Sequence, residues 1–360
     1  DIRFDWNNGD PRISLTDNGE GMTEEKLVAA LRLGAISPTE ERHEKDLGRF
    51  GLGLKTASFS QARRLVVATK TKATRLVSRC WDLDYIESSQ EWRLLYGDGY
   101  LTAGEQDRLQ VMEQGTMVLL ENLDRMFSGG ASEEHKKAEY FSRAEHLSSH
   151  LGTVFHRFLS SPSKLSIWIN PEVTGSAPVE AWDPFLANME KTQILQDEYL
   201  QVGSEIVHVQ PYVLPHQSAF KTNVDHRRAA GLKGWNAQQG FYVYRNNRLL
   251  VSGSWLNLGI RQEEHYKLAR IALDITNKLD DVWDIDVRKS QAVPPVGVKS
   301  DLKRIATRVR RQAKEVYGHR GKIINAPVKR KLVQLWEARK KDEKVSYRIN
   351  RKYPLLEDIK

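Results

Sequence analysis

Apolar and polar residues alternate from the first positions of the chain. Ile2, Phe4 and Trp6 are each separated by one polar residue, and a turn rich in asparagine, glycine and proline follows. The alternation then resumes on the far side of the turn. The pattern predicts a β-hairpin over residues 1–16, with its turn at residues 7–11.

The spacing then changes to that of a helix. Thr23 can cap a helix N-terminus, and the apolar residues that follow recur every three or four positions up to Leu33. Lys26 stands where a capping box would have Glu or Gln, so the box is incomplete. We expect a helix here, a polar loop over residues 35–47, and a second helix over about residues 54–61.

The rest of the chain also mixes the two patterns. Strands are expected at residues 64–69, 74–78, 114–120, 165–169, 205–213 and 268–275, with a hairpin at 240–250 that turns at Asn246 and Asn247. Helices are expected over residues 138–159 and where Leu302, Ile305, Val309 and Val316 recur at helical spacing. The predicted fold class is therefore α+β.

Length and composition are those of an ordinary globular protein. The 360 residues suffice for two domains, and no apolar run approaches the roughly 20 residues of a membrane span. Cys80 is the only cysteine, which excludes an internal disulfide and fits a reducing cytoplasm. The ten histidines show no metal-ligand spacing, so we expect no metal site built on them.

Positive charge is concentrated at the C-terminal end. Residues 301–360 hold 19 Lys and Arg against 7 Asp and Glu, whereas the whole chain has a net charge of +8. A basic end on a near-neutral body indicates an anionic partner, with nucleic acid, and DNA in particular, as the first candidate. A solvated helical tail whose lysines only maintain solubility would give the same composition.

Two glycine-rich segments carry the chemistry that the sequence offers. In the first, residues 17–22, Asp17 follows a predicted strand and precedes Gly19 and Gly21. A carboxylate can accept a hydrogen bond from an exocyclic amine such as that of adenine, and glycine lets a ligand approach the backbone. A plain turn would also explain this segment if it stood alone.

The second segment, residues 48–55, leads directly into a predicted helix. Its glycines have the spacing G-x-x-G-x-G, and a helix N-terminus presents unpaired N–H groups that suit phosphate. The spacing is neither that of a Walker A loop nor that of a dinucleotide-binding fingerprint.

Taken together and in this order, the two segments resemble the GHKL ATPases, the superfamily of gyrase, the large heat-shock chaperones, histidine kinases and MutL. Gly115 and Thr116, before a predicted strand, complete the likeness. The amino-acid sequences of residues 16–22 and 47–55 are most similar to those of the MORC-type branch and its bacterial relatives. The resemblance covers about residues 10–123 and implies a Bergerat-type α/β sandwich that binds ATP with Mg²⁺.

The resemblance also implies roles for individual residues. Asp17 would bind the adenine amino group with support from Thr116 through a water, residues 34–47 would form a lid, and the backbone of the second segment would hold the phosphates. The nucleotide-binding residues implied in this way are Asp17, Gly19, Gly21, Met22, Gly48, Arg49, Phe50, Gly51, Leu52, Gly53, Leu54, Lys55 and Thr116. Without the resemblance, the favoured interpretation of Lys55 is a solvated helix residue, and that of Thr116 is the start of a strand.

The second half of the chain resembles the transducer domain that follows the nucleotide domain in MutL, topoisomerase VI and MORC proteins, a domain of the ribosomal S5-like type. The segment 244–249 is similar to a strand-turn segment of that domain, and Lys289 is the candidate for its γ-phosphate sensor. We therefore expect an ATP-binding domain at 1–128, a transducer-like domain at 129–318 and a basic, partly helical tail at 319–360.

The resemblance further predicts what this chain lacks. GHKL ATPases carry a Glu-x-x-x-Asn pattern, the general base and the Mg²⁺ ligand, on a helix before the first strand, and no such helix pattern occurs here. We expect a chain truncated at its N-terminus that binds ATP, hydrolyses it poorly, and is monomeric where the intact parent would be a dimeric ATPase. A chaperone of the large heat-shock type and a nucleic-acid-binding module with a vestigial pocket stay open as alternatives.

Overall fold

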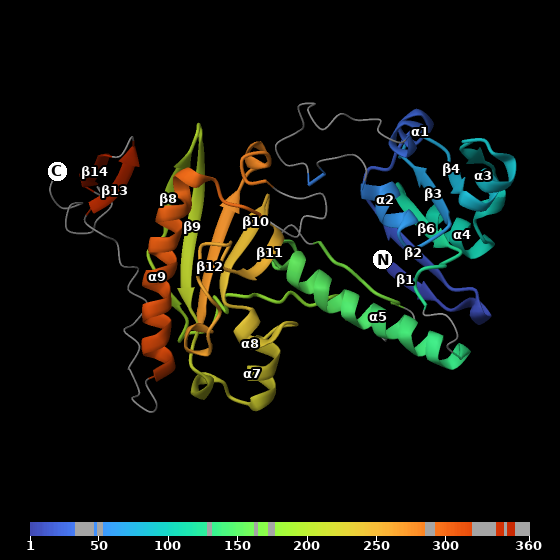
Figure 1. Ribbon diagram of the computed structural model, residues 1–360. Coiled ribbons are helices and arrows are strands. Elements are labelled where there is room, and N and C mark those ends of the chain that lie inside the picture. Colours follow the sequence, from blue (N-terminus) through green and yellow to red (C-terminus); the bar gives the residue numbers. More distant parts are fainter. Residues whose placement is uncertain are drawn as a thin grey trace. The chain divides into compact units, whose positions relative to one another are not determined.

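The computed structural model describes residues 1–32, 47–48, 53–127, 132–161, 165–171, 177–284, 292–318, 336–341 and 344–349. The chain divides into two compact units, and each has its own sheet and core (Figure 1). The first unit comprises Asp1–Arg42, Gly48–Gly152 and Ser161–Glu180, and the second comprises His43–Leu47, Thr153–Ser160 and Ala181–Lys360.

The first unit is built on a six-stranded antiparallel sheet. Its spatial order is β1-β2-β6-β3-β4-β5, from β1 (Ile2–Asp5), β2 (Arg12–Asp17), β3 (Arg64–Lys70), β4 (Val77–Asp82), β5 (Leu95–Tyr96) and β6 (Gly115–Glu121). The predicted hairpin at the start of the chain is confirmed, with Ile2 opposite Leu15 and a turn in which Asn7 and Asn8 have positive φ. Asparagine tolerates that conformation better than most residues, which explains its use in the turn.

Helices cover both faces of this sheet. On one face, Leu65 and Val67 of β3 pack with Leu27 and Leu31 of α1 (Glu24–Leu31), beside α2 (Gly53–Phe59). On the other face, Ala68 and Met117 pack with Leu109 of α4 (Ala103–Val111). Successive side chains on β3 therefore serve opposite cores, as the period of two requires. A further helix, α3 (Leu83–Ser89), follows β4 directly.

The long helix α5 (Glu133–Val154) belongs to the first unit as far as Gly152. Its Tyr140 is fully buried, with its ring 5.2 Å from that of Phe4, and its hydroxyl donates to the carbonyl of Arg12. These contacts tie α5 to the hairpin of the first unit.

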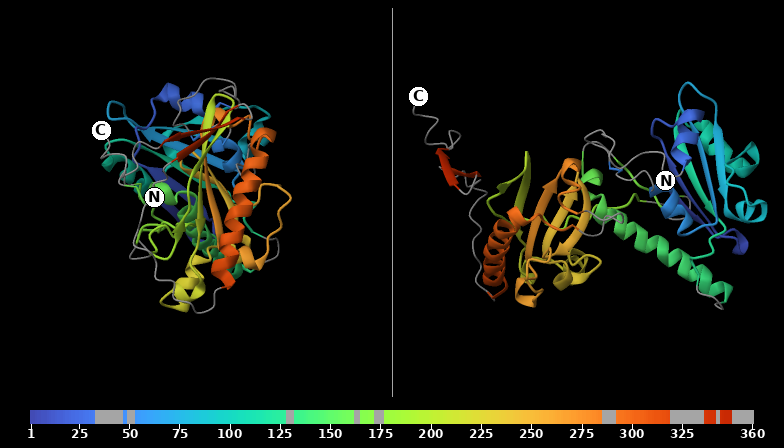
Figure 2. Two further views of the ribbon diagram at one scale, coloured as in Figure 1. Left: turned by 90° about the vertical axis from the view of Figure 1, so that its left-hand side faces the viewer. Right: turned by 45° about the horizontal axis from the view of Figure 1, so that its top comes forward.

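The second unit is a mixed sheet with one long helix against it. The strand order is β11-β10-β12-β9-β7, with β8 also paired to β9, from β7 (Gln193–Ile194), β8 (Glu198–Val202), β9 (Glu205–Val213), β10 (Gly240–Arg245), β11 (Arg248–Ser254) and β12 (Ala269–Ile275). Helix α9 (Val296–Gly318) buries Leu302, Ile305 and Val309 against this sheet, and Figure 2 shows it running along the strands. Shorter helices are α6 (His156–Leu159), α7 (Asn223–Ala229) and α8 (Gly234–Ala237).

The predicted hairpin of the second unit is also confirmed. β10 and β11 are antiparallel and turn at Asn246 and Asn247, whose φ angles are 48° and 67°. Two consecutive positive φ angles are those of a type I′ turn, whose twist matches that of the strands. Together the two units give the predicted α+β class.

Three predicted elements differ from the structure. Residues 165–169 form no regular strand, and only an isolated bridge joins Ile169 to Ile2. The predicted helix 138–159 is two helices, α5 and α6. Beyond Gly318, where a partly helical tail was expected, the described residues form two antiparallel strands, β13 (Trp336–Lys341) and β14 (Lys344–Ile349). Among the described residues, no helix is long and apolar enough to cross a membrane.

Candidate nucleotide site

Three polar residues form a row across adjacent strands of the first unit. Asp17 at the end of β2 lies opposite Thr116 of β6, and Thr116 lies opposite Thr69 of β3. Residues directly opposite one another point to the same face of a sheet. That face is the one covered by α1, because Val67, two residues before Thr69, packs in the core with α1.

Asp17 presents an exposed carboxylate at one end of this row. Its Oδ1 accepts a hydrogen bond from the backbone N–H of Gly19 at 2.8 Å, which fixes the carboxylate in an Asx turn. No hydrogen bond from the described residues reaches Oδ2. Asp17 therefore offers an oriented acceptor to a ligand on this face.

Two glycines, one in the first segment and one at the start of β6, let the backbone of residues 17–22 pack closely on that of β3 and β6. Gly21 has a φ of +67°, and a Cβ there would lie 1.9 Å from the carbonyl oxygen of Lys70. Gly115 has a φ of +150°, and a Cβ there would lie 2.2 Å from the carbonyl oxygen of Asp17. Any other residue at these positions would push residues 17–22 away from β3 and β6.

Thr69 joins these parts and was not among the residues predicted from the sequence. Its Oγ1 accepts from the N–H of Met22 at 2.9 Å and lies 3.0 Å from both the carbonyl oxygen of Gly115 and Oγ1 of Thr116. Thr69 is fully buried. The available signal was a threonine in an otherwise apolar strand, at a position whose parity places it on the same face as Leu65 and Val67.

The comparison with known families bears on this part of the chain. Residues 1–116 match the family described as histidine kinase-, DNA gyrase B- and HSP90-like ATPase, and the matched span includes the entire polar row. The first unit contains a GHKL-type ATPase domain.

Comparisons with solved structures and with curated proteins give less information about this chain. The solved structure of the ATPase and transducer domains of DNA topoisomerase II from Balamuthia mandrillaris is similar at 12% identity and a TM-score of 0.42, over 87% of this chain and 78% of that one. A search of the curated proteins gave no match. At these levels, neither result refines the site of the GHKL domain.

Lys55 of the GHKL domain is directed to α1. Its side chain is buried, and Nζ donates to the carbonyl oxygens of Ala30 at 2.8 Å and Arg32 at 2.6 Å. Burial lowers the pKa of the Lys55 ammonium. A cation at the C-terminus of a helix is favourable, so Lys55 joins the end of α1 to the start of α2. The role of Lys55 toward a phosphate stays a prediction.

The remaining predicted residues divide between described and undescribed parts. Gly53 begins α2, and Leu54 packs against the core of the GHKL domain. Gly48 is described, whereas Arg49, Phe50, Gly51 and Leu52, residues 34–46 of the expected lid and Lys289 lie outside the described residues. Within the described part, no group of three His, Cys, Asp or Glu side chains could hold a metal ion.

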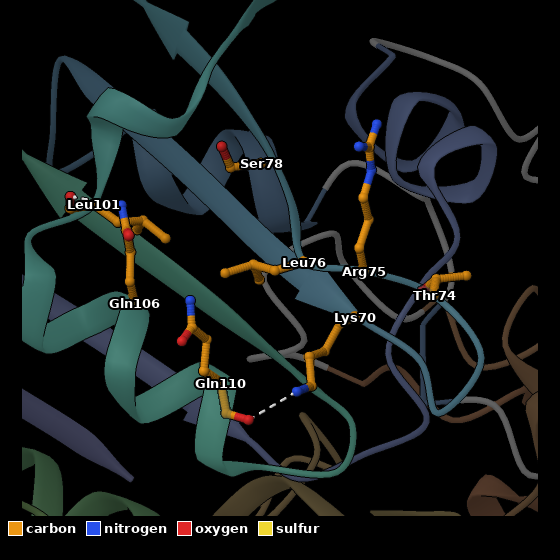
Figure 3. A pocket seen from close by; sticks show the side chains of 8 residues that line it. All are labelled: Lys70, Thr74, Arg75, Leu76, Ser78, Leu101, Gln106 and Gln110. Carbon is orange, nitrogen blue, oxygen red and sulfur yellow. Dashed lines mark hydrogen bonds between the residues drawn. The ribbon is translucent and has the colours of Figure 1, made fainter.

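A groove of about 370 Å³ lies on the opposite face of the same sheet. Figure 3 shows Gln106 and Gln110 of α4 lining the groove together with Leu76, and Lys70 at one end donates to the carbonyl oxygen of Gln110 at 3.0 Å. Lys70 directly follows Thr69, so the two side chains leave β3 on opposite faces. The groove is therefore separate from the polar row of the GHKL domain.

Proposed function

We propose that the GHKL domain binds ATP, with the adenine amino group on Asp17. The observation that carries this proposal is the oriented carboxylate of Asp17 at the end of a polar row, whose Oδ2 accepts no hydrogen bond from a described residue. A carboxylate attracts the exocyclic amine of adenine and repels the carbonyl oxygen at the same position of guanine, which favours ATP over GTP. Thr116 lies beside Asp17 on the same face and would support it through a water.

Binding and hydrolysis make different demands. Hydrolysis also requires a base on the attacking water and a metal ion on the phosphates. We confine the proposal to adenine nucleotide binding.

Calorimetric titration of ADP against three proteins tests this proposal. Asp17→Asn removes the charge from the acceptor and is expected to weaken binding by about tenfold or more, since a hydrogen bond to a charged group is worth about 1.5–3 kcal/mol. The matched control is Asp107→Asn, an exposed carboxylate on α4. Equal affinity of the wild type and Asp17→Asn would contradict the proposal.

We further propose that the second unit acts as a transducer that couples ATP-dependent lid closure to a partner. Support comes from the β10–β11 hairpin, which places the predicted strand-turn segment, residues 244–249, in a defined type I′ turn. Lys289 is the proposed γ-phosphate sensor. Analytical ultracentrifugation with a non-hydrolysable ATP analogue checks the assembly: we expect a monomer for the present chain, and a tight nucleotide-dependent dimer would contradict this.

A specific observation also favours a polyanionic partner, for which we propose duplex DNA. Lys303, Arg311 and Lys314 of α9 are exposed and form no ion pair with a described residue, whereas Arg304 and Arg310 are paired with Glu198 and Glu263. At 1.5 Å per residue the three unpaired cations span about 16 Å of helix, a length that can follow several phosphates.

Fluorescence anisotropy with labelled duplex DNA at several salt concentrations tests the partner. Changing Lys303, Arg311 and Lys314 to Gln is expected to weaken binding and to flatten the salt dependence by up to about three phosphate contacts. The control is the same change at Lys72, Arg93 and Lys137 of the first unit, which are also exposed. An identical salt slope for the two triple variants would exclude α9 as the contact.

A further inference from the structure

The hydroxyl of Thr69 has more partners than protons. A threonine hydroxyl donates one hydrogen bond and accepts two. The N–H of Met22 donates to Thr69 Oγ1 at 2.9 Å and so occupies one acceptor position. The single proton of Thr69 then has two possible acceptors, each 3.0 Å away: the carbonyl oxygen of Gly115 and Oγ1 of Thr116.

These two choices have opposite consequences for Thr116. If Thr69 donates to Gly115, Thr116 has to donate its own proton to Thr69 and presents only lone pairs toward Asp17. If Thr69 donates to Thr116, the proton of Thr116 is free to point along the row toward Asp17. Both side chains are buried, Thr69 fully and Thr116 to 9% exposure, so bulk water does not compete for these bonds.

We propose that Thr69 is a positioning residue of the nucleotide site. It holds the Gly19–Met22 turn against β3 through the N–H of Met22, and it sets whether Thr116 offers a proton or a lone pair to the base. The inference rests on the proposed adenine site. Adenine has an acceptor nitrogen, N1, next to its exocyclic amine. An adenine on Asp17 therefore requires the arrangement in which Thr69 donates to Thr116, because the proton of Thr116 is then free for N1. Guanine has an N–H at the same place and would require the other arrangement.

Thr69→Val tests the proposal because valine keeps the shape and strand preference of threonine and removes only the hydroxyl. The variant leaves the N–H of Met22 and the hydroxyl of Thr116 without their common partner. We expect the ADP dissociation constant to rise by about tenfold in calorimetry, as for loss of a buried hydrogen-bonding partner. Thr69→Ser restores the hydroxyl and is expected to bind ADP within about threefold of the wild type.

Ser78→Ala is the matched control. Ser78 is a buried hydroxyl on the neighbouring strand β4 and lies opposite Ala68, on the other face of the sheet, where it donates to the carbonyl oxygen of Gly97 at 2.8 Å. Its loss is expected to leave ADP affinity unchanged. Wild-type affinity in Thr69→Val, or failure of Thr69→Ser to restore binding, would overturn the inference.

Amide hydrogen exchange without nucleotide separates this inference from the proposed function. Thr69→Val should speed exchange at Met22 and Gly19, and neither Thr69→Ser nor Ser78→Ala should do so. Unchanged exchange at Met22 in Thr69→Val would overturn the anchoring role whether or not ADP binds. Absence of ADP binding to the wild type would instead contradict the adenine site itself, and with it the role of Thr69 toward the base.

Discussion

At the residue scale, the candidate site is defined by how tightly backbone and side chains pack around a few polar atoms. Gly21 and Gly115 bring residues 17–22 against β3 and β6, and Thr69 supplies the hydroxyl that those segments share. The exposed atoms of Asp17 are thus held by buried neighbours. This arrangement is what a pre-organised acceptor requires, since an oriented group loses little freedom when a ligand binds.

Gly21→Ala is predicted to disrupt the site by displacing the backbone of residues 17–22. The added Cβ would meet the carbonyl oxygen of Lys70 at 1.9 Å, at a φ that alanine rarely adopts. We expect a loss of about 1–3 kcal/mol in the unfolding free energy of the first unit and weaker ADP binding, measured by chemical denaturation and calorimetry.

Gly104→Ala provides the comparison. A Cβ at Gly104 in α4 meets nothing within 4 Å, so alanine should leave stability unchanged or raise it by up to about 1 kcal/mol. If Gly21→Ala behaved like Gly104→Ala, the close packing of this turn would not matter for the site.

Individual residues also show how far the sequence could be interpreted. Asp17 and its glycines have a local signature, because the turn they form depends mainly on adjacent residues. The role of Thr69 depends on Met22 and Thr116, each 47 residues away along the chain. The role of Lys55 depends on Ala30, which is 25 residues away. No spacing rule predicts such contacts, since they follow from strand register and from helix packing.

At the scale of elements, the sheet of the second unit carries a charged cluster on the face away from α9. Asp274 of β12 lies opposite His208 of β9, and Arg157 of α6 binds the Asp274 carboxylate while its guanidinium lies 3.5 Å from the ring centroid of Tyr244. Asp197 accepts from His208 Nε2 at 3.1 Å. The carboxylates of Asp274 and Asp197 raise the pKa of His208.

The raised pKa predicts the direction of a pH effect. The folded protein binds the His208 proton more tightly than the unfolded chain does. Protonated His208 therefore stabilises the folded state, and its contribution is complete below the ordinary histidine pKa of about 6.5. The contribution is lost as the pH rises through the raised pKa of His208 in the folded state. Urea unfolding of wild type and His208→Gln between pH 5 and 9 should show a stability difference that shrinks as pH increases.

A neighbouring histidine serves as the internal contrast. Burial lowers the pKa of His156, which is hydrogen-bonded to Tyr244, to about 4. Titration of His156 therefore has the opposite effect on stability: it destabilises the folded protein as the pH falls below about 6.5. A difference between wild type and His208→Gln that grows with pH would contradict the assigned partners of His208.

Helix α9 supports the same sheet through its apolar stripe. Leu302 is fully buried, whereas Lys303 beside it is exposed. Leu302→Ala should lower the unfolding free energy of the second unit by about 2–5 kcal/mol, and Lys303→Ala should change it by less than about 0.5 kcal/mol. Similar stabilities of the two variants in urea unfolding would show that the stripe is not the core contact.

Elements with strong periodicity were predicted well, and the exceptions have physical reasons. Both hairpins were found because alternation and turn residues coincide. The residues at 165–169 alternate, but among the described residues they form just one bridge, to the edge strand β1. In the tail, Val345, Tyr347 and Ile349 alternate with polar residues and mark a strand. The many lysines and arginines obscured this pattern and favoured a helix.

At the scale of the whole molecule, two units with separate cores predict separable stabilities. All described residues of the nucleotide site belong to the first unit. A ligand that binds only the folded first unit stabilises that unit alone, by about 2.7 kcal/mol at a concentration 100 times its dissociation constant.

Scanning calorimetry with and without ADP checks this expectation. ADP should raise the midpoint of one unfolding transition, and the second transition, identified by its lower midpoint in Leu302→Ala, should stay in place. Asp17→Asn should remove the shift. Equal shifts of both transitions would contradict a site confined to the first unit.

The most direct test of the central claim is to locate bound adenine nucleotide on the chain. In two-dimensional NMR of glycine- and methionine-labelled protein, the account predicts that ADP shifts the amide signals of Gly19, Gly21 and Met22 and that Asp17→Asn suppresses these shifts. Saturable binding of ADP that leaves these three amides unchanged, and shifts glycines of the second unit such as Gly203 and Gly253 instead, would contradict it.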